Sequence, residues 1–491
     1  MSFRITAAAL LALAAGVLHA QDALIAEETA TAAPRRPQLS AEQARSYDYR
    51  EVLKYTGRAG AETLDPWDPL ADPLARGASF RPDYTVDAAA QADGVKTFAT
   101  VQAAISRAVS DIAAQAVRAD RIYILVKPGT YRELVYIPAA AVPITLYGEG
   151  KDAAATRIEA GLDAAVSSAR YAQQFGSQFS NVHPSIQEMH ALIKARTNIS
   201  TSGTPTVWVR NKGFQARNIT FENSYNKATG NAGDECSERA CGNSAVDAQA
   251  TKIHHQAVAL LVEGADKAQF ENIRLIGFQD TLYLKSVETR VTARSFFNKS
   301  YIEGDVDFIF GDTTAFFYQS EIKSLGDRST SYVVAPNTNW KTKYGLVFDR
   351  CRFTSDGSPN ARLGNFFLGR QWFNNSRCTP YSQVPLEGYS CMLGAENVYK
   401  APKGAITPTA LETVGKAVVL NSSIGKHIHR NTPWSDWNRQ GTLPYRPAQF
   451  TSDDYWNNLR QAGIEPVKQL GYTKQPSPAD IYLAEFNNSV E

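Results

Sequence analysis

The sequence carries little net charge and few long apolar runs for a chain of 491 residues. Lys and Arg number 51 and Asp and Glu 49, which leaves a net charge of +2 at pH 7. This balance argues against a protein that binds nucleic acid through bulk charge. Beyond the first 20 residues no stretch approaches 18 uninterrupted apolar residues, so we expect no stable membrane insertion. A few placed residues can still recognise an acidic substrate.

Cysteine is also scarce, with five residues and no C-x-x-C pair, which argues against zinc and redox motifs. Cys236 and Cys241 lie in the polar segment GDECSERACGN and can close a short disulfide. Cys378 and Cys391 flank a second loop and can close another. Cys351 lies among strand-forming residues in LVFDRCRF, where we expect a buried, unpaired thiol.

The first 20 residues have the layout of a cleavable secretory signal. They read MSFRITAAALLALAAGVLHA, with one Arg near the start, an apolar run and a small residue before Gln21. We therefore expect a soluble, exported protein, either periplasmic or secreted. Disulfides are compatible with that compartment.

The length alone would suggest roughly three domains, but no polar or Pro-rich linker interrupts the middle of the chain. Residues 21–80 are rich in Ala, Pro and Asp and are predicted to form an N-terminal arm. Residues 81–491 are predicted to form one large domain with a C-terminal packing segment. Near its start, apolar residues recur at helical spacing in KTFATVQAAISRAVSDIAAQ, which predicts one amphipathic helix.

An internal repeat predicts the fold. Six segments each consist of an apolar stretch, a small or polar residue, and an apolar residue two places on: FQARNITF, AQFENIRL, SFFNKSYI, AFFYQSEI, LVFDRCRF and VVLNSSI. Their last apolar residues are separated by 54, 27, 20, 31 and 71 positions and are Phe221, Leu275, Ile302, Ile322, Phe353 and Ile424. These spacings fit multiples of one coil with loop insertions.

Stacked coils of this size form an all-β solenoid, in which each coil adds short strands to parallel sheets. The amphipathic helix is then predicted to cap its open N-terminal end. A β-sandwich with irregular loops is the alternative fold, but it does not explain the repeated spacing.

Two aspartates occupy equivalent positions in this repeat. Asp280 lies five residues after Leu275, and Asp307 lies five residues after Ile302. Because neighbouring parallel strands are about 4.8 Å apart, we expect the two carboxylates to lie roughly 5 Å apart. Two carboxyl groups that close rarely both ionise at neutral pH, so the pair can provide an acid and a nucleophile. Either aspartate alone would more simply be a turn or capping residue.

Other polar and aromatic side chains surround the pair in sequence. Arg370, between an apolar run and Trp372, is expected to bind Asp307 as a two-pronged donor. Gln256 and Gln279 offer neutral NH₂ donors that can hold a developing oxyanion, although ordinary hydrogen bonding along the ladder is a second interpretation. Aromatic surface for sugar rings is predicted at Tyr283, Phe310 and Trp372, with core packing as the alternative.

Four of these segments, QAVALLV, GFQDTLYL, GDVDFIFG and LGRQW, resemble the signature blocks of the pectin methylesterase (pectinesterase) family. The segments TSGTPTVWVRNKGFQARNITFENS and NSSIGKHI are also similar to that family, and the resemblance covers roughly residues 90 to 430. It implies a right-handed parallel β-helix that removes methyl esters from pectin or methylated oligogalacturonates. It also implies no cofactor or metal, and we expect a monomer.

The resemblance implies a role for each site residue. Asp307 matches the nucleophile and Asp280 the general acid and base. Gln256 and Gln279 match the oxyanion-stabilising glutamines, Arg370 the arginine that orients the nucleophile, and Trp372 the aromatic floor of the cleft.

The chain departs from the family pattern in four places. Gln371 stands where the family usually has Pro, and the insertions around 160–200 and 224–255 and the arm at 21–80 are longer than simple secreted members need. Some exported bacterial relatives have lost the catalytic carboxylate and are described as thioesterase-like or binding proteins. This chain retains both aspartates.

Four other functions are weighed against this one. The sequence contains no G-x-S-x-G motif, the turn that carries the nucleophilic serine in many serine esterases, which argues against that class of enzyme. Metal-dependent hydrolysis is weakly supported, because His254 with His255 and His427 with His429 have no third ligand nearby in the sequence. A β-helix enzyme that cleaves the pectin chain, or a non-catalytic carbohydrate-binding protein of the cell envelope, remains a rival within the same fold.

Overall fold

The computed structural model describes residues 35–225, 255–288, 290–373, 380–381, 408–437, 445–465 and 480–491. The predicted signal at 1–20 and the proposed disulfides of Cys236 with Cys241 and of Cys378 with Cys391 lie outside these residues. Cys351 lies within them and is a buried free thiol, as the sequence predicts.

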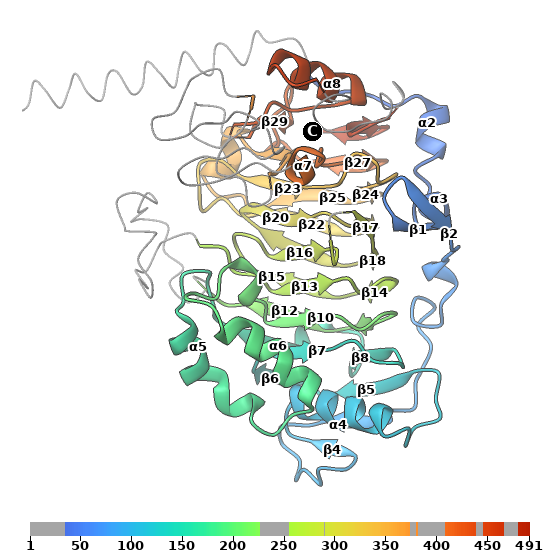
Figure 1. Cartoon of the computed structure of the whole chain (residues 1–491), viewed down its shortest axis with the longest axis vertical. Helices are drawn as coiled ribbons and strands as arrows, with labels where there is room; N and C mark the ends of the chain where they lie inside the picture. The colour runs from blue at the N-terminus through green and yellow to red at the C-terminus, as the bar shows by residue number, and fades with distance from the viewer. Residues whose placement is uncertain are drawn as a thin grey trace, which may run out of the picture.

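Parallel strands stack coil upon coil along the long axis of the molecule (Figure 1). Among the described residues they form three long sheets of eight, nine and eleven strands, which we name by those numbers. The eight-stranded sheet contains β7 (Val135–Ile137), β10 (Val207–Val209), β13 (Leu260–Glu263), β16 (Leu282–Lys285), β20 (Val306–Gly311), β23 (Tyr332–Pro336), β26 (Phe367–Arg370) and β29 (Trp434–Ser435).

The other two sheets run beside it through the same coils. The nine-stranded sheet contains β6 (Gly129–Arg132), β9 (Thr156–Ala160), β12 (Thr220–Asn223), β15 (Arg274–Ile276), β19 (Tyr301–Gly304), β22 (Glu321–Ser324), β25 (Arg352–Ser355), β28 (Ser423–Ile424) and β31 (Ser489–Val490). The eleven-stranded sheet contains β3 (Tyr84–Val86), β4 (Thr97–Phe98), β5 (Ile122–Val126), β8 (Ile144–Gly148), β11 (Gln215–Arg217), β14 (Ala268–Glu271), β18 (Arg294–Asn298), β21 (Thr314–Tyr318), β24 (Leu346–Asp349), β27 (Ala417–Leu420) and β30 (Leu483–Phe486).

The repeat found in the sequence is the register of the nine-stranded sheet. Each apolar position pairs with the next along β12, β15, β19, β22, β25 and β28, and all six side chains are at most 2% exposed. The predicted parallel β-helix is thus confirmed, and the β-sandwich alternative is wrong. The side chain at this position points into the core on every coil. It must therefore be apolar, because the core of the β-helix is packed only by such inward side chains.

A sharp corner precedes each of these strands. The residues three positions before the ladder residues all have φ between 47° and 56°, in the left-handed region: Asn218, Asn272, Lys299, Gln319, Arg350 and Asn421. Asparagine tolerates this conformation best among residues with a side chain, and three of the six are Asn. The Nδ2 of Asn272 also donates to Oδ1 of Asn218, 2.9 Å away on the next coil.

The predicted amphipathic helix covers the N-terminal end of the β-helix as α4 (Val101–Ala113) (Figure 1). It begins later than the periodicity suggests, because Phe98 belongs to β4 and Thr100 is the N-cap. The buried carboxylate of Glu133 accepts the N–H groups of Val101 and Gln102, at 2.8 and 2.9 Å. These two orphan donors of the first turn are therefore satisfied inside the protein.

The helices that follow α4 in the chain lie outside the three sheets. They are α5 (Ser168–Phe175), α6 (Pro184–Lys194), α7 (Pro408–Leu411), α8 (Ser452–Gln461) and the 3₁₀ turns η2 (Ala153–Ala155), η3 (Gly176–Phe179), η4 (Thr201–Gly203) and η5 (Asn360–Leu363). Helices α5 and α6 belong to the insertion around 160–200. They pack against each other, and α6 contacts β7 (Figure 1). There the hydroxyls of Tyr136 and Tyr171 are 2.7 Å apart. No helix in the described ranges is long and apolar enough to cross a bilayer.

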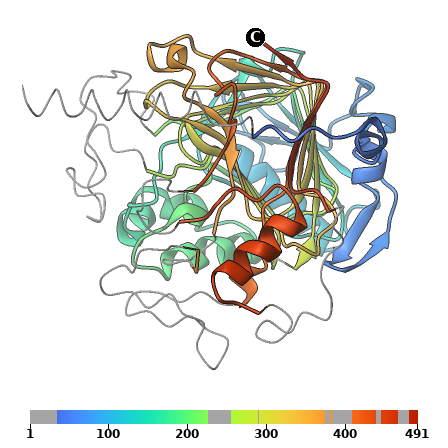
Figure 2. The same ribbon diagram turned by 90° about the horizontal axis from the view of Figure 1, so that it is seen from above.

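Residues 35–80 run along the outside of the eleven-stranded sheet (Figures 1 and 2). They contain α2 (Ala41–Arg45), α3 (Tyr49–Val52), β1 (Tyr55–Arg58), β2 (Ala61–Leu64) and η1 (Pro69–Ala71). Strand β1 pairs antiparallel with β17 (Val291–Thr292) of the body. Buried side chains of this segment, including Tyr49 and Leu53, pack against Phe296 and Phe316 on the outer face of the sheet.

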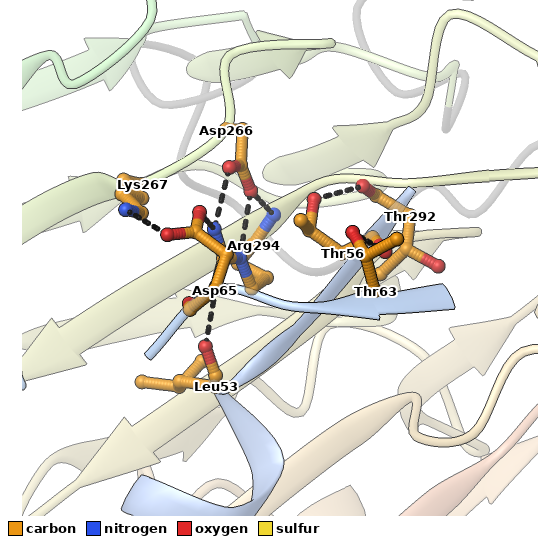
Figure 3. Close-up of polar contacts among 8 residues, drawn as sticks. All are labelled: Leu53, Thr56, Thr63, Asp65, Asp266, Lys267, Thr292 and Arg294. Atoms are coloured by element: carbon orange, nitrogen blue, oxygen red, sulfur yellow. Dashed lines mark hydrogen bonds and ion pairs between the residues drawn. The ribbon is translucent and has the colours of Figure 1, made fainter. Parts of the chain in front are cut away.

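One buried arginine fastens this segment to the body (Figure 3). The side chain of Arg294 is 0% exposed and donates to both carboxylate oxygens of Asp266, at 2.9 and 2.7 Å. It also donates to the carboxylate of Asp65 at 2.7 Å and to the main-chain oxygens of Leu53 and Asp65, each at 2.6 Å. A fully buried guanidinium thus depends on acceptors from both parts of the chain.

Candidate active site

Asp280 and Asp307 lie at equivalent positions of adjacent coils. Strands β16 and β20 pair with Leu282 opposite Ile309, so the aspartates two residues earlier share the same 27-residue offset. The main-chain N–H of Asp280 donates to the carbonyl of Val306 at 3.1 Å, which fixes the two coils together at this point. Both aspartates are nearly buried, each 7% exposed.

Both aspartates have positive φ angles, 66° for Asp280 and 50° for Asp307. A non-glycine residue in this left-handed region is energetically unfavourable and is enriched at functional sites. The register of β20 with β23 also shifts between Val306 and Ile309, on either side of Asp307. Both members of the pair thus share the left-handed conformation that the corner residues before the nine-stranded sheet also adopt.

Arg370 binds Asp307 through two parallel hydrogen bonds. Its Nε donates to Oδ1 at 2.9 Å and its Nη2 to Oδ2 at 2.7 Å, the geometry expected from the sequence. The guanidinium lies between the rings of Tyr332 and Trp437, each centred 4.0 Å from it. Two aromatic faces and one carboxylate hold the arginine in a single orientation.

The pKa of Asp280 is raised well above the ordinary value, first because the carboxyl is buried and then because the charge of Asp307 lies beside it. The positive charges of Arg328 and Arg370 oppose this rise but do not reverse it. Burial and the neighbouring charge thus favour the protonated form of Asp280, while Asp307 is bound by Arg370.

The two glutamines lie on neighbouring coils beside the pair. Gln279 directly precedes Asp280 and is 7% exposed, and its Oε1 accepts a hydrogen bond from Nη2 of Arg328 at 2.6 Å. Gln256 is half-buried. The N–H of Ala257 donates to the carbonyl of Gln279 at 3.0 Å, so main-chain pairing holds the two glutamine segments side by side.

The predicted aromatic residues form one continuous cluster next to the pair. The rings of Tyr283 and Phe310 stack with centroids 4.2 Å apart, and Phe310 meets Trp372 edge to face at 5.7 Å. Tyr283 and Phe310 are 6% and 3% exposed, whereas Trp372 is only partly buried. Trp372 thus presents the exposed aromatic surface of the cluster. The rings of Tyr283 and Phe310 are buried and pack behind it.

Comparison with known proteins agrees with this geometry. The Pectinesterase family model matches residues 225–384. A pectinesterase of Ralstonia solanacearum is 33% identical over 431 residues, which cover 85% of this chain and 87% of that protein. This chain belongs to the pectinesterase family. The solved structure of rice weevil pectin methyl esterase superposes with a TM-score of 0.63 at 24% identity, over 93% of this chain and 98% of the other.

The pectinesterase family also includes proteins with other names. YbhC of Escherichia coli K12, named as an acyl-CoA thioester hydrolase, is 30% identical over 69% of this chain and 73% of its own length. Its crystal structure superposes with a TM-score of 0.64 at 25% identity, over 93% and 95% of the two chains. Family membership therefore establishes the scaffold, while the substrate must be argued from the site.

The side chain of Gln371 explains how this pectinesterase-family chain accommodates a residue other than Pro. Gln371 is buried, and its Nε2 donates to the carbonyls of Gly415 and Gln449, both at 2.9 Å. Its Oε1 accepts the N–H of Gln449 at 2.7 Å. The amide replaces the rigidity of a proline ring with three hydrogen bonds to the C-terminal segment, immediately before Trp372.

Four residues of the site were not found by sequence reasoning: Tyr332, Trp437, Arg328 and Asp305. Trp437 and Tyr332 lie in short segments distant from Arg370 in sequence, and only the coil register brings them to its two faces. Arg328 lies in the polar loop GDRSTS, which carries no pattern that distinguishes it from a solvated turn.

Proposed function

We propose that this protein is a carboxylic ester hydrolase that removes methyl esters from pectin, releasing methanol and leaving free galacturonate carboxylates. The observation that carries the proposal is the in-register aspartate pair, in which Arg370 binds Asp307 and the pKa of Asp280 is raised by burial and by the neighbouring charge. Membership of the pectinesterase family supports it, and the secretory signal predicted at residues 1–20 suits action outside the cytoplasm on a plant polysaccharide.

In the first half of the reaction, the carboxylate of Asp307 attacks the ester carbonyl carbon. Arg370 holds both oxygens of Asp307 and so keeps the attacking carboxylate in place. The NH₂ groups of Gln256 and Gln279 donate to the oxyanion of the tetrahedral intermediate. The protonated Asp280 then gives its proton to the departing methoxide oxygen, which leaves as methanol.

The second half restores the enzyme. Asp280, now ionised, accepts a proton from a water molecule that attacks the acyl carbon of the anhydride between substrate and Asp307. The bond from that carbon to the Asp307 oxygen breaks, giving a free galacturonate carboxylate and the Asp307 carboxylate. One carboxyl pair thus serves as nucleophile, acid and base, and the chemistry needs no cofactor.

The likeness to YbhC supports a second candidate, thioester hydrolysis. An anhydride route through Asp307 would apply to a thioester as well, because only the leaving group changes. The open aromatic surface of Trp372 beside the pair favours a sugar ring over a flexible acyl chain.

The decisive experiment is methanol release from highly methylated pectin and from methylated oligogalacturonates, followed in a pH-stat. Asp307→Asn and Asp280→Asn are each expected to lower the rate at least about 10³-fold while the β-sheet signal in circular dichroism stays that of the folded parent. Asp312→Asn is the matched control, because Asp312 is also buried and follows Asp307 on the same coil but binds the N–H of Ser286.

Near-parental activity of either pair variant, or acyl-CoA hydrolysis without methanol release, would overturn the proposal. New reducing ends without methanol would indicate a chain-cleaving enzyme instead.

A further inference from the structure

A second arginine reaches the aspartate pair from the loop between β22 and β23. The Nη2 of Arg328 donates to Oε1 of Gln279 at 2.6 Å, and its Nε lies 3.1 Å from Oδ2 of Asp305. The side chain of Arg328 is 22% exposed and that of Asp305 is fully buried. The positive charge is also close enough to Asp280 to oppose the rise in its pKa.

The contact decides which way the Gln279 amide points. A guanidinium has only donors, so the atom of Gln279 that faces Arg328 must be the carbonyl oxygen. The NH₂ group of the same amide then points to the other side of the side chain. Without Arg328 the amide could turn over and present its oxygen to the reacting centre, where an acceptor would repel a developing oxyanion.

Asp305 anchors the arginine through the same coil that carries Asp307. Its Oδ1 accepts the N–H of Val306 at 2.7 Å, and its own N–H donates to the carbonyl of Phe278 at 3.2 Å. Its carbonyl accepts the N–H of Tyr332 at 3.2 Å, which brings in the start of β23. The carboxylate of Asp305 is therefore held in place, and its ion pair restrains the guanidinium of Arg328 beside it.

We propose that Arg328 is a positioning residue, which together with Asp305 fixes the Gln279 amide so that its NH₂ faces the oxyanion. This inference rests on the proposed ester hydrolysis. It adds the side chain of Arg328, which contacts no substrate atom in the proposed reaction. Arg328 acts on the transition state through Gln279, so its loss lowers kcat and leaves substrate binding nearly unchanged.

The first test compares Arg328→Gln and Arg328→Lys in methanol release. We expect kcat to fall roughly 10- to 100-fold in both, with KM within about 2-fold, because a misoriented donor loses part of an oxyanion contact. Lys keeps the charge but cannot bridge Asp305 and Gln279 as a fork does. Arg352→Gln, which removes an exposed arginine paired with Glu321, is the matched control and should retain parental kcat.

The pH dependence of methanol release separates two effects of Arg328, its positive charge near Asp280 and its contact with Gln279. The charge affects the pH at which the rate declines on the alkaline side. Removing the positive charge in Arg328→Gln should move this decline to higher pH, whereas Arg328→Lys should leave it in place. The charged groups that act on Asp280 besides Arg328 are Asp307, Arg370 and Asp305. A parental alkaline decline in both variants with reduced kcat in both would still support the geometric role, but parental kcat in both would overturn it.

A double-mutant cycle tests whether Arg328 works through Gln279. In a Gln279→Ala background, Arg328→Gln should reduce kcat by less than about 2-fold further, because the amide that it orients is gone. Fully multiplicative losses would contradict the proposal while leaving the ester hydrolase assignment intact. A crystal structure of Arg328→Met at atomic resolution, where the amide oxygen and nitrogen can be told apart, provides a readout that needs no activity. An unchanged Gln279 amide, with its oxygen still toward position 328, would overturn the inference even if the proposed substrate were wrong.

Discussion

Two carboxyl groups of identical chemistry have different surroundings at this site, and the surroundings separate their roles. Asp307 has both oxygens bound by Arg370, which neutralises its charge and holds it still. Asp280 is buried beside that charge, and its pKa is raised well above the ordinary range. A shared geometry with unequal partners is enough to make one residue a nucleophile and the other an acid.

The raised pKa of Asp280 predicts a cost in stability that depends on pH. In the unfolded chain Asp280 loses its proton near the ordinary value of 3.8, whereas in the native protein it keeps it to higher pH. The native state therefore loses stability as pH rises from that value through the native pKa, by about 1.4 kcal/mol for each pKa unit between the two states.

Asp280→Asn removes this titration, so the inactive variant should be more stable than the parent at pH 8 and similar to it near pH 3. Urea unfolding at both pH values measures the difference. A variant equally or less stable at pH 8 would contradict the assigned environment of Asp280. In the parent, methanol release should decline on the alkaline side as the acid loses its proton.

At the scale of elements, residues 35–80 complete a buried charge network that belongs to the β-helix. Arg294 on β18 is fully buried, and its partners Asp266 and Asp65 come from the body and from this segment (Figure 3). The side chain of Asp266 is 11% exposed, whereas that of Asp65 is 43% exposed. We infer that the segment is part of the folded unit and that its loss would leave a buried cation half-satisfied.

The unequal burial predicts unequal costs. Asp266→Ala should lower the free energy of unfolding by about 3–5 kcal/mol, because it leaves Arg294 buried without its main partner. Asp65→Ala should cost less, because water can replace the half-exposed carboxylate. Glu288→Ala breaks the exposed ion pair with Arg58 and serves as the control, with little expected change. Denaturant unfolding measures all three, and equal costs for Asp266→Ala and Asp65→Ala would contradict this account of the network.

At the scale of the whole molecule, stability is built from contacts between successive coils. In the eleven-stranded sheet four buried phenylalanines stack face to face with centroids 4.5, 4.9 and 4.5 Å apart, in the order Phe270, Phe297, Phe317 and Phe348. Within this stack each ring meets the ring of the preceding or following coil, as expected for a solenoid in which interactions are between nearest neighbours.

This arrangement predicts coupling between neighbours and additivity between distant coils. Phe297→Leu and Phe317→Leu are each expected to cost about 1–2 kcal/mol, and the double variant should depart from the sum by at least 0.5 kcal/mol. Phe270→Leu and Phe348→Leu, which lie at the two ends of the stack, should add within about 0.5 kcal/mol. Denaturant unfolding of the six variants tests this, and equal coupling in both pairs would rule out a nearest-neighbour ladder.

The sequence by itself determined the coil, because an inward position must be apolar on every turn and so leaves a repeat that can be read directly. The shared pattern of six segments predicts the six ladder residues, and the structure pairs each of them with the next. The same spacing placed Asp280 and Asp307 together, and the apolar run before Arg370 indicated its carboxylate partner.

Only the tertiary structure decided what surrounds the pair, because those contacts come from loops whose residues follow no period. Arg328 and Asp305 meet Gln279 through a turn of ordinary polar composition. Tyr332 and Trp437 enclose Arg370 from coils that are about 40 to 70 residues away in sequence. An inward position must be apolar in every coil, so the sequence repeats it. A residue of the site is needed at one place only, so the sequence contains no repeat that would reveal it.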